Sequence, residues 1–478
     1  MSFRHPSRET VVPLLVACAL FMENLDSSVI ATALPAIARS MGEDPLRLSM
    51  AITSYLLSLA IFIPISGWMA DRFGGRTVFR AAIAVFTLGS VACGLAGSLP
   101  ELVAARILQG AGGAMMVPVG RLVLLRTVPK ARLLRAMAFV TVPALIGPVL
   151  GPPLGGFIAT YASWRWIFFI NVPIGLLGIL LVGRFIHDDP QPDARPLDVR
   201  GFLLTGFALG GIMFGFEALG RGALAPWLLV LLLGGGALCA GLYAMHARRH
   251  PHPIVDFTLM RIPTFRAALL GGILFRVSIG AIPFLMPLML QLAFGLSAFA
   301  SGLITFAGAA GALTMKFTAG PFLRLFGFRR VLIANSVISG VFLLGYGLFE
   351  ADTPHWAILA VLLAGGFFRS LQFTALNTLA YADAPPEQLS RATSLVSVAQ
   401  QLSLSLGVGL GAVVLHLTRL GRDGTGLVVD DFDPAFLAIG ALSFLAALFF
   451  VPLAPNAGAE VSGHRPRGGP ARADAAAD

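Results

Sequence analysis

The chain has 478 residues, of which 56% are hydrophobic and only 12% are charged. A soluble globular domain carries roughly 25% charged residues, so this composition excludes an ordinary soluble protein and indicates a chain that lies in a lipid bilayer. The net charge of +10 would suggest a nucleic-acid partner in a soluble protein, but here the loop positions of the arginines explain it, and we expect no nucleic acid. The cysteines have no CxxC spacing and predict neither a disulfide framework nor a metal site; they are Cys18, Cys93 and Cys239.

Long apolar segments follow one another along the whole chain. A helix needs about 20 apolar residues to cross roughly 30 Å of hydrocarbon, and segments of this kind predict fourteen transmembrane helices. A β-barrel is not expected, because its strands would alternate in hydropathy over about ten residues. The predicted fold class is an all-α polytopic membrane protein. The expected helices span residues 11–37, 47–70, 78–97, 101–124, 134–160, 164–186, 201–219, 226–246, 265–290, 298–318, 329–349, 355–380, 392–416 and 434–454.

Basic residues are unevenly distributed among the loops between these helices. Most of the 34 Lys and Arg residues fall in alternate loops, the richest being "RLVLLRTVPKARLLR" at 121–135. Because cytoplasmic loops carry the excess of Lys and Arg, we expect both termini in the cytoplasm. The first span carries acids and lacks an obvious cleavage site, so we interpret it as a retained helix and not as a signal peptide. The end of the chain, 455–478, is rich in Ala, Gly, Pro and charge and is predicted to be a disordered cytoplasmic tail.

An internal repeat divides the chain into two halves. The segment "GWMADRFGGR" at 67–76 aligns with "GPFLRLFGFR" at 320–329, and the matched pairs are Gly67 with Gly320, Gly74 with Gly327, and Arg76 with Arg329. Each segment follows the second helix of a six-helix unit, and such repeats form substrate sites at their interface. The predicted parts are a cytoplasmic N-terminus at 1–10, a six-helix bundle at 11–186, a linker with two extra transmembrane helices at 187–264, and a second six-helix bundle at 265–454.

Five motifs follow one another along the chain. They are "LDSSVIATALP" at 25–35, "GWMADRFGGR" at 67–76, "RILQGAGGA" at 106–114, "GPVLGPPLGG" at 147–156 and "WRWIFFINVPIG" at 164–175. In this order they resemble the motifs of the major facilitator superfamily, and within it the 14-helix drug:proton antiporters of the EmrB/QacA type. The stretches "GGAMMVPVGRL" and "ASWRWIFFINVPIG" are most similar to the MdtD-like branch. The resemblance covers nearly the whole chain.

This resemblance implies two pseudo-symmetric six-helix bundles with two inserted helices, in the inner membrane of a bacterium. The implied activity is proton-coupled export of small molecules by alternating access, with the substrate, protons and the lipid bilayer as partners. The alternative is export of an endogenous organic anion or a metal chelate. We see no HExxH, GxSxG or Walker loop, so we expect no enzyme, no cofactor and no nucleotide. The expected state is a monomer, and the sequence identifies no outer-membrane partner.

Two acids in the first apolar segment, Glu23 and Asp26, are the predicted proton-coupling residues. Their spacing of three places them on one helix face, and an intramembrane carboxylate costs roughly 2.5–3.5 kcal/mol, so each should face a cavity or a partner. The resemblance assigns the counterpart of Arg106 to coupling, and a cation near Asp26 would favour its ionised form. Alternatively, Asp26 only bonds a neighbouring helix, Glu23 extends toward water, and Arg106 anchors its helix through carbonyl groups.

Two further arginines, Arg276 and Arg369, fall near the middle of helices in the second half, where the motifs do not account for them. If they line the cavity, they would favour substrates that carry a carboxylate or phosphate, or zwitterions. Alternatively each pairs with backbone groups or with polar neighbours such as Gln372 and Asn377. These four residues are the candidates for the substrate cavity.

The remaining motif residues predict mechanical roles. The fifth-helix stretch has no titratable group, and its small residues allow close helix approach while its prolines bend the helix; in the family it is associated with export. Charges in the loop after the second helix can latch one conformation, on one side only, because Arg324 stands where the first repeat has Asp71. The exporter-motif residues are Gly147, Pro148, Gly151, Pro152, Gly155 and Gly156, and the latch residues are Gly67, Asp71, Arg72, Gly74 and Arg76.

Overall fold

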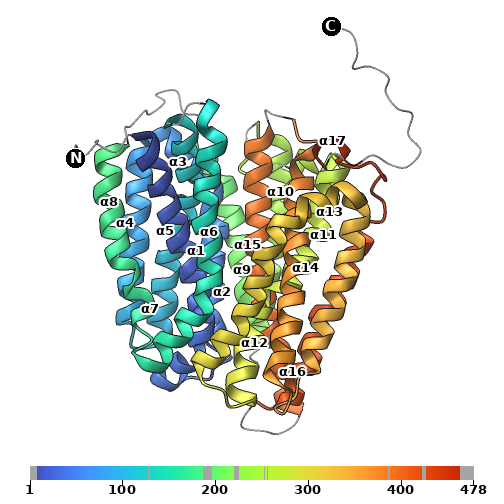
Figure 1. Cartoon of the computed structure of the whole chain (residues 1–478). Helices are drawn as coiled ribbons and strands as arrows, with labels where there is room; N and C mark the ends of the chain where they lie inside the picture. Colours follow the sequence, from blue (N-terminus) through green and yellow to red (C-terminus); the bar gives the residue numbers. More distant parts are fainter. Residues whose placement is uncertain are drawn as a thin grey trace, which may run out of the picture.

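All secondary structure in the described part of the computed structural model is helical (Figure 1). The described residues are 8–127, 130–186, 196–219, 225–251, 253–255, 257–385, 388–421, 427–462 and 464. Their side chains are described except at 8–10, 125–126, 130–145, 217, 219, 317, 389–391 and 394. The predicted N-terminus at 1–7, part of the linker at 187–195 and the tail from 465 onward therefore lie outside the described residues.

The first bundle contains the six helices that the apolar segments predict. The second and sixth are each interrupted, the second by a 3-10 turn and the sixth by a short break before Asn171. The elements are α1 (Arg8–Met41), α2 (Ser49–Phe62), η1 (Ile63–Ile65), α3 (Ser66–Phe73), α4 (Gly75–Leu95), α5 (Leu99–Thr127), α6 (Lys130–Tyr161), α7 (Trp166–Phe169) and α8 (Asn171–Phe185).

The inserted pair and the second bundle complete the predicted set. The two spans predicted at 298–318 and 329–349 are both present within the stretch labelled α13, where the non-helical backbone of Gly327 separates two helices. The elements are α9 (Val199–Leu219), α10 (Pro226–Arg249), η2 (Phe257–Arg261), α11 (Pro263–Gly280), α12 (Ile282–Leu288), η3 (Met289–Ala293), α13 (Ala298–Gly347), α14 (His355–Ala382), α15 (Leu389–Gly421), η5 (Val429–Asp431), α16 (Phe432–Leu448) and α17 (Ala459–Ser462).

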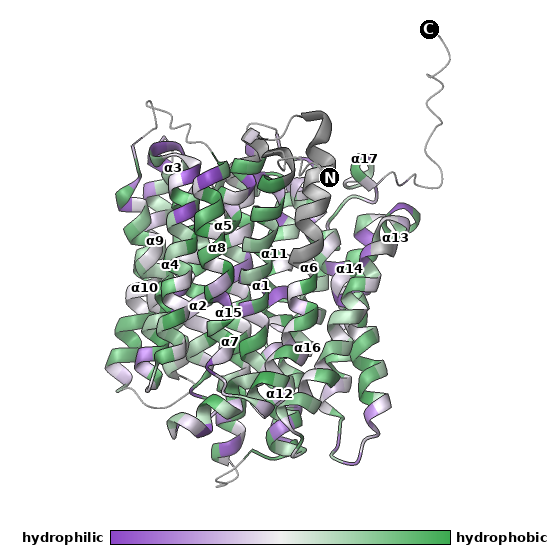
Figure 2. Ribbon diagram, turned by 60° about the vertical axis from the view of Figure 1, so that its left-hand side comes forward, coloured by the Kyte–Doolittle hydropathy of each residue, from purple (hydrophilic) through white to green (hydrophobic). Residues whose placement is uncertain are grey.

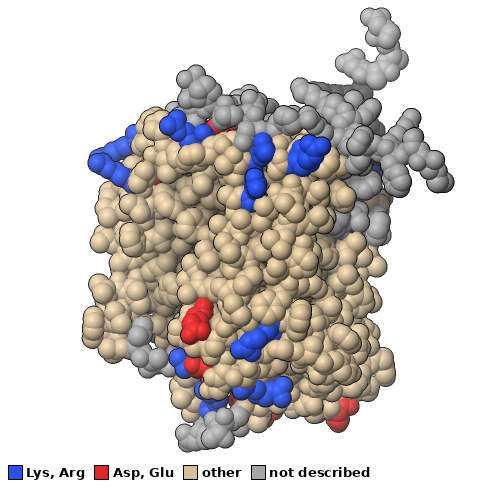
Figure 3. Space-filling model, turned by 90° about the vertical axis from the view of Figure 1, so that its left-hand side faces the viewer, with Lys and Arg blue, Asp and Glu red and all other residues tan. Residues whose placement is uncertain are grey.

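The helices have the length and composition of membrane spans. Within the described residues, 13 helical segments are long and apolar enough to cross a membrane, and α6, with 32 residues, corresponds to the remaining predicted span. Apolar residues dominate the middle of the molecule in Figure 2, and hydrophilic ones gather toward its two ends. Figure 3 shows the same division on one face, where a broad band lies between charged side chains at either end. The prediction of an all-α polytopic membrane protein is confirmed.

Two six-helix bundles stand side by side, with α1 to α8 in one and α11 to α16 in the other (Figure 1). They meet where α6 packs against α13 and where α2 packs against α15. The inserted helices α9 and α10 pack against each other, and α9 also contacts both α2 and α15. The inserted pair therefore touches both bundles at one of the two seams between them.

The stretch predicted to begin the disordered tail is partly ordered. Residues Ala459–Ser462 form the helical turn α17, which packs against α13 and α14. The turn begins after Gly458, whose φ of 65° is left-handed. His464 Nδ1 lies 2.9 Å from the carbonyl oxygen of Arg324. The composition of this stretch was a poor guide because a few local contacts hold it against the second bundle.

The backbone confirms the alignment of the internal repeat. Gly74 (φ 85°, ψ 140°) and Gly327 (φ 73°, ψ 162°) adopt nearly the same conformation, one that is accessible almost only to glycine. Arg76 Nη2 donates a hydrogen bond to the carbonyl of Gly183 at 2.7 Å, and Arg329 Nη2 donates one to the carbonyl of Val451 at 3.0 Å. Each arginine thus bonds a carbonyl near the end of its own bundle, Gly183 in the last turn of α8 and Val451 three residues after α16.

This equivalence gives a stability prediction. We expect Gly327→Ala to lower the free energy of unfolding by about 1–3 kcal/mol, because a side chain in this backbone region is strained. Gly320→Ala is the matched control, since a Cβ there meets open space. Unfolding of the purified protein in mixtures of mild detergent and sodium dodecyl sulfate measures the difference. Equal stability of the two variants would contradict the prediction.

Candidate functional site

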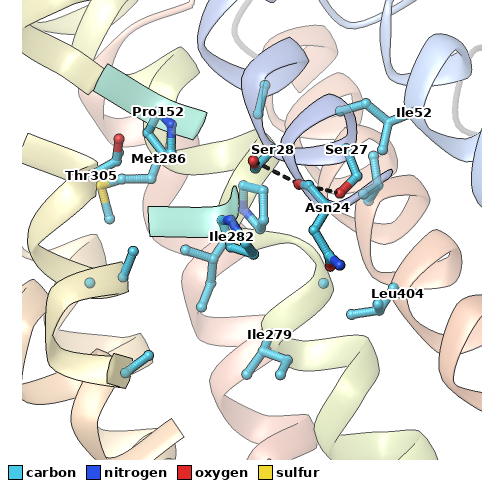
Figure 4. A pocket seen from close by; sticks show the side chains of 18 of the residues that line it. Asn24, Ser27, Ser28, Ile52, Pro152, Ile279, Ile282, Met286, Thr305 and Leu404 are labelled. Atoms are coloured by element: carbon cyan, nitrogen blue, oxygen red, sulfur yellow. Dashed lines mark hydrogen bonds between the residues drawn. The ribbon is translucent and has the colours of Figure 1, made fainter. Parts of the chain in front are cut away.

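A cavity of about 460 Å³ lies between the two bundles. Its walls come from α1, α2, α5 and α6 on one side and from α11 to α15 on the other. Figure 4 shows the apolar side chains of Ile52, Ile279 and Leu404 around the space, with Ser27 and Ser28 of α1 bonded to the backbone of their own helix. The volume and the apolar lining are typical of small-molecule sites.

A few charged side chains border this apolar space. Glu23 enters from the first bundle, and its Oε2 is buried without a hydrogen-bond partner in the described part of the chain. Lys316 and Arg369 face it from the second bundle, and Lys316 Nζ donates a hydrogen bond to Thr374 Oγ1 at 3.0 Å. The Glu23 carboxylate on the first-bundle wall therefore lies across the cavity from two cationic side chains on the second-bundle wall.

Asp26 lies in the interior of the first bundle, where 3% of its surface is exposed. Its Oδ2 accepts a hydrogen bond from Arg106 Nη1 at 2.5 Å. Its Oδ1 accepts from Gln109 Nε2 at 2.8 Å and from Asn171 Nδ2 at 3.0 Å. Three donors from α5 and α8 therefore converge on this carboxylate.

Arg106 connects this carboxylate to the cavity. Its Nε donates to the carbonyl of Ala51 at 2.9 Å, and its Nη1 also donates to Gln109 Oε1 at 2.7 Å. The guanidinium carbon lies 4.1 Å from the centre of the Tyr55 ring, a cation–π contact. Its Nη2 is buried and has no hydrogen-bond partner among the described residues, and Arg106 borders the cavity.

The two acids of α1 do not share one environment, although their spacing places them on one helix face. Glu23 lines the cavity, whereas Asp26 is buried behind it, against α5 and α8. Residues three apart in a helix with 3.6 residues per turn are still about 60° apart. At the edge of a cavity that rotation is enough to separate a cavity-facing side chain from a bundle-facing one.

The four substrate-cavity candidates in the second bundle also divide into cavity-lining and buried residues. Arg369 lines the cavity, but Arg276, Gln372 and Asn377 are absent from its described lining. Arg276 is buried, donates from Nη2 to Asn377 Oδ1 at 2.9 Å, and leaves Nε and Nη1 without partners in the described residues. Gln372 donates to Ser336 Oγ at 2.7 Å. Here the predicted pairing of an arginine with a polar neighbour holds for Arg276.

Small residues of the exporter motif bring α6 against α1 and α13. A Cβ on Gly151 would collide with the Ser28 side chain, and one on Gly155 would collide with the Val29 carbonyl. On the other face, a Cβ on Gly156 would collide with the carbonyl of Ala298. Gly147 stands beside the α1 backbone, and Pro148 and Pro152 line the cavity. The motif therefore has the predicted close packing, on two faces of one helix.

The predicted latch residues lie at the turn between α3 and α4. Arg76 ties α4 to α8 through the Gly183 carbonyl, a contact within the first bundle. Arg72 is exposed, Asp71 is half-buried, and a Cβ on Gly67 would meet open space.

Hydrogen bonds join the bundles at the end of the molecule away from the termini (Figure 1). There α6 ends and α13 begins, and the backbone N–H of Phe299 donates to Thr160 Oγ1 at 3.0 Å. Gln291 Nε2 donates to the carbonyl of Thr32 at 3.0 Å. An ion pair of 2.6 Å joins Arg419 of α15 to Asp44 of the first bundle. We call this end of the molecule, where these contacts join the two bundles, the closed end.

Sequence reasoning missed several residues that this arrangement uses. Gln109 and Asn171 lie inside quoted motifs. An intramembrane charge is costly and therefore marks a candidate site in the sequence, whereas an uncharged amide does not stand out in this way. Tyr55 is an ordinary aromatic residue in an apolar segment. Lys316 stands near the end of its predicted span, where a lysine usually extends to the interface. Only the fold brings these side chains to the cavity or to the hydrogen bonds around Asp26 and Arg106.

The buried ion pair gives a second stability prediction. We expect Arg106→Ala to lower the free energy of unfolding by about 3–5 kcal/mol, because it leaves the Asp26 carboxylate buried without its cation. The double variant Asp26→Asn with Arg106→Ala should lose less, since no charge remains unpaired. Unfolding in detergent mixtures measures both. A double variant at least as unstable as Arg106→Ala alone would show that the unpaired carboxylate is not what destabilises the single variant.

Comparison with known proteins relates this chain to membrane transporters. The family model described as Major Facilitator Superfamily matches residues 16–262 and 268–475. The "Putative multidrug resistance protein MdtD" of Salmonella heidelberg is 40% identical over 447 residues, which cover 92% of this chain and 94% of that protein. The protein of the same name from Salmonella typhimurium is 40% identical over 451 residues, with the same shares covered.

Solved structures show the same fold. A D-xylose-proton symporter matches with a TM-score of 0.67 and 18% identity over 95% of this chain and 99% of that chain. A POT family transporter in complex with 5-aminolevulinic acid matches with a TM-score of 0.68 and 15% identity over 95% of this chain and 98% of that chain. Together with the two bundles and the cavity between them, these matches show that the chain belongs to the major facilitator superfamily.

Proposed function

We propose that this protein is a proton-coupled secondary transporter of the multidrug type that exports chemically diverse small molecules by alternating access. The observation that carries the proposal is the buried Asp26 carboxylate, held by Arg106 at the wall of a cavity between two bundles. The names of the relatives support the substrate class. In this proposal the energy source is a proton gradient that acts on the chain's own titratable groups, as the resemblance to drug:proton antiporters implies.

Asp26 is the proton-coupling residue in this proposal, and Arg106 transmits its state. Protonation of Asp26 removes the charge that holds Arg106 Nη1 and weakens a bond between α1 and α5. Arg106 also bonds the α2 backbone at Ala51 and packs on Tyr55, so its release affects two helices that border the cavity. A ligand shifts a conformational equilibrium only by its differential affinity for the two states, and this pair supplies such a difference for a proton.

Glu23 and the apolar wall are the substrate-facing elements of the same proposal. The unpartnered Glu23 carboxylate is suited to a cationic group, and the apolar lining to a lipophilic body. Lys316 and Arg369 on the opposite wall are suited to an anionic or polar group of the same molecule. Few fixed polar contacts in a mostly apolar space give broad rather than narrow selectivity.

The direction of transport follows from the orientation of the molecule. We place both termini in the cytoplasm and the chain in the inner membrane of a bacterium, because Lys and Arg concentrate on that side. The closed end near Phe299 is then external, and the glycine packing of α6 against α13 seals it. In this proposal the conformation described above is the one that receives substrate from the cytoplasm, and Arg76, with the turn at Gly74, keeps the first bundle rigid as it rotates.

In the cycle that we propose, substrate enters from the cytoplasm and the bundles reorient to open outward. A proton then binds Asp26 as substrate leaves, and its release to the cytoplasm restores the ion pair with Arg106. The moving units are the bundles at 11–186 and 265–454, joined through the inserted helices at 187–264. One chain carries both bundles, so a monomer is sufficient.

Proton coupling is tested with substrate-induced proton movement in energised everted vesicles. We expect lipophilic cations and neutral drugs to collapse the proton gradient with the wild type and not with Asp26→Asn, because the variant has no carboxylate to protonate. Glu23→Gln should weaken the response to cations more than the response to neutral drugs. Gly210→Ala is the expression control, since a Cβ there meets open space.

Each result has a defined meaning. Proton movement by Asp26→Asn equal to that of the wild type would remove Asp26 from the coupling role. A response to organic acids alone would replace the multidrug proposal by export of an organic anion, with Arg369 as its recognition residue.

Alternating access is tested by a reversible cross-link at the closed end. Thr160→Cys with Phe299→Cys, in a background without the three native cysteines that still transports, places two thiols at a point where the bundles touch. A short reducible thiol cross-linker should abolish transport, and reduction should restore it, because the outward opening requires these residues to separate. Each single cysteine variant treated alike should keep its activity. Full transport by the cross-linked protein would exclude opening at this end.

A further inference from the structure

Two histidines and an aspartate meet where the inserted helices join the rest of the chain, away from the cavity. His246 and His250 lie four residues apart at the end of α10, and their rings stack with centroids 5.0 Å apart. Asp198 directly precedes α9. One ligand atom from each of the three residues lies within 4.8 Å of the others. The transport proposal uses none of them.

The carboxylate of Asp198 is only partly satisfied by its protein partners. Its Oδ1 accepts from the backbone N–H of Gly201 at 2.8 Å and lies 2.8 Å from His246 Nε2. Its Oδ2 is buried and has no hydrogen-bond partner in the described part of the chain, and only 7% of the residue is exposed. A buried oxygen without a partner is costly and calls for an additional ligand such as an ion.

The surroundings favour a cation. A spacing of four places both imidazoles on one helix face, and the C-terminal end of a helix carries partial negative charge. Two imidazoles and one carboxylate are a ligand set for zinc and related divalent transition metals, whereas magnesium and calcium prefer oxygen ligands. Three protein ligands leave a fourth position for water. Metal bonds of about 2.0–2.2 Å require these ligand atoms, which lie within 4.8 Å of one another, to converge on one ion.

We propose that Asp198, His246 and His250 form a binding site for a divalent transition metal of the zinc class. The sequence alone does not predict this metal site, because Asp198 is separated from the histidine pair by the whole inserted hairpin. The metal would join the residue before α9 to the end of α10. Nearby, Tyr243 OH bonds both backbone groups of Val255, on the path to α11. Metal binding would therefore fix both connections of the inserted pair to the bundles.

Cobalt is the probe for this site, because its visible absorption reports imidazole and carboxylate ligands directly. The full-length protein, purified without a polyhistidine tag and treated with a chelator, is titrated with Co²⁺, and Zn²⁺ is then added in competition. We expect one equivalent of bound Co²⁺ that Zn²⁺ displaces. His250→Ala and Asp198→Asn should each lower the affinity about tenfold or more. His355→Ala, which alters an exposed histidine in another helix, is the matched control.

Thermal unfolding separates a lost ligand from a damaged fold. His250→Ala keeps the contact between Asp198 and His246 but removes the ring that stacks on His246, so the unfolding temperature with chelator is the reference for each protein separately. Zn²⁺ should raise that temperature for the wild type and not for the variant. Absence of saturable Co²⁺ binding, or equal binding by the wild type and both ligand variants, would overturn the proposal and leave Asp198 as a helix cap bonded to a histidine. These measurements do not depend on transport, so their failure leaves the proposed function untouched.

Discussion

The ion pair between Asp26 and Arg106 is the interaction on which the organisation of the first bundle depends. Burying a charge costs several kcal/mol even after the protein relaxes, so the pair persists only where other groups complete its hydrogen bonds. Gln109 and Asn171 donate to the carboxylate, and the Ala51 carbonyl accepts from the guanidinium. These partners come from α2, α5 and α8, and all must reach the ion pair that joins α1 to α5. Their requirement fixes the relative positions of four helices.

The glycines that follow Arg106 serve the same requirement. A Cβ on Gly110 would lie 2.7 Å from both the Ser58 side chain and the Tyr55 carbonyl, and one on Gly112 would collide with the Phe86 backbone. Without these glycines α5 would stand farther from α2 and α4, and Arg106 could not reach Ala51. Close approach of small residues is a general means of helix association in membranes. In this bundle it also positions a charge.

The sequence predicted what depends on length and local pattern. Apolar segments of membrane-spanning length located the helices, and the repeat located the turns at Gly74 and Gly327. It was harder to predict which side chains line the cavity together, because that depends on how each helix is rotated about its axis relative to helices distant in the sequence. Glu23 and Asp26 separate for this reason, and Gln372 bonds Ser336 of α13 rather than lining the cavity. Asp198 and His246 are 48 residues apart, and no local pattern connects them.

The contacts at the closed end are weak enough for the state to reverse. The hydrogen bonds of Phe299 and Gln291 each contribute about 0.5–1.5 kcal/mol net, and the partly exposed pair of Asp44 and Arg419 about 0–1 kcal/mol. Their sum is a few kcal/mol, whereas a hundredfold difference in ligand affinity between two states corresponds to about 2.8 kcal/mol. One proton or one substrate with such a preference can therefore reverse the balance. The glycine packing of α6 adds surface contact but no strong polar bond, so the bundles can separate there without leaving charged groups unpaired.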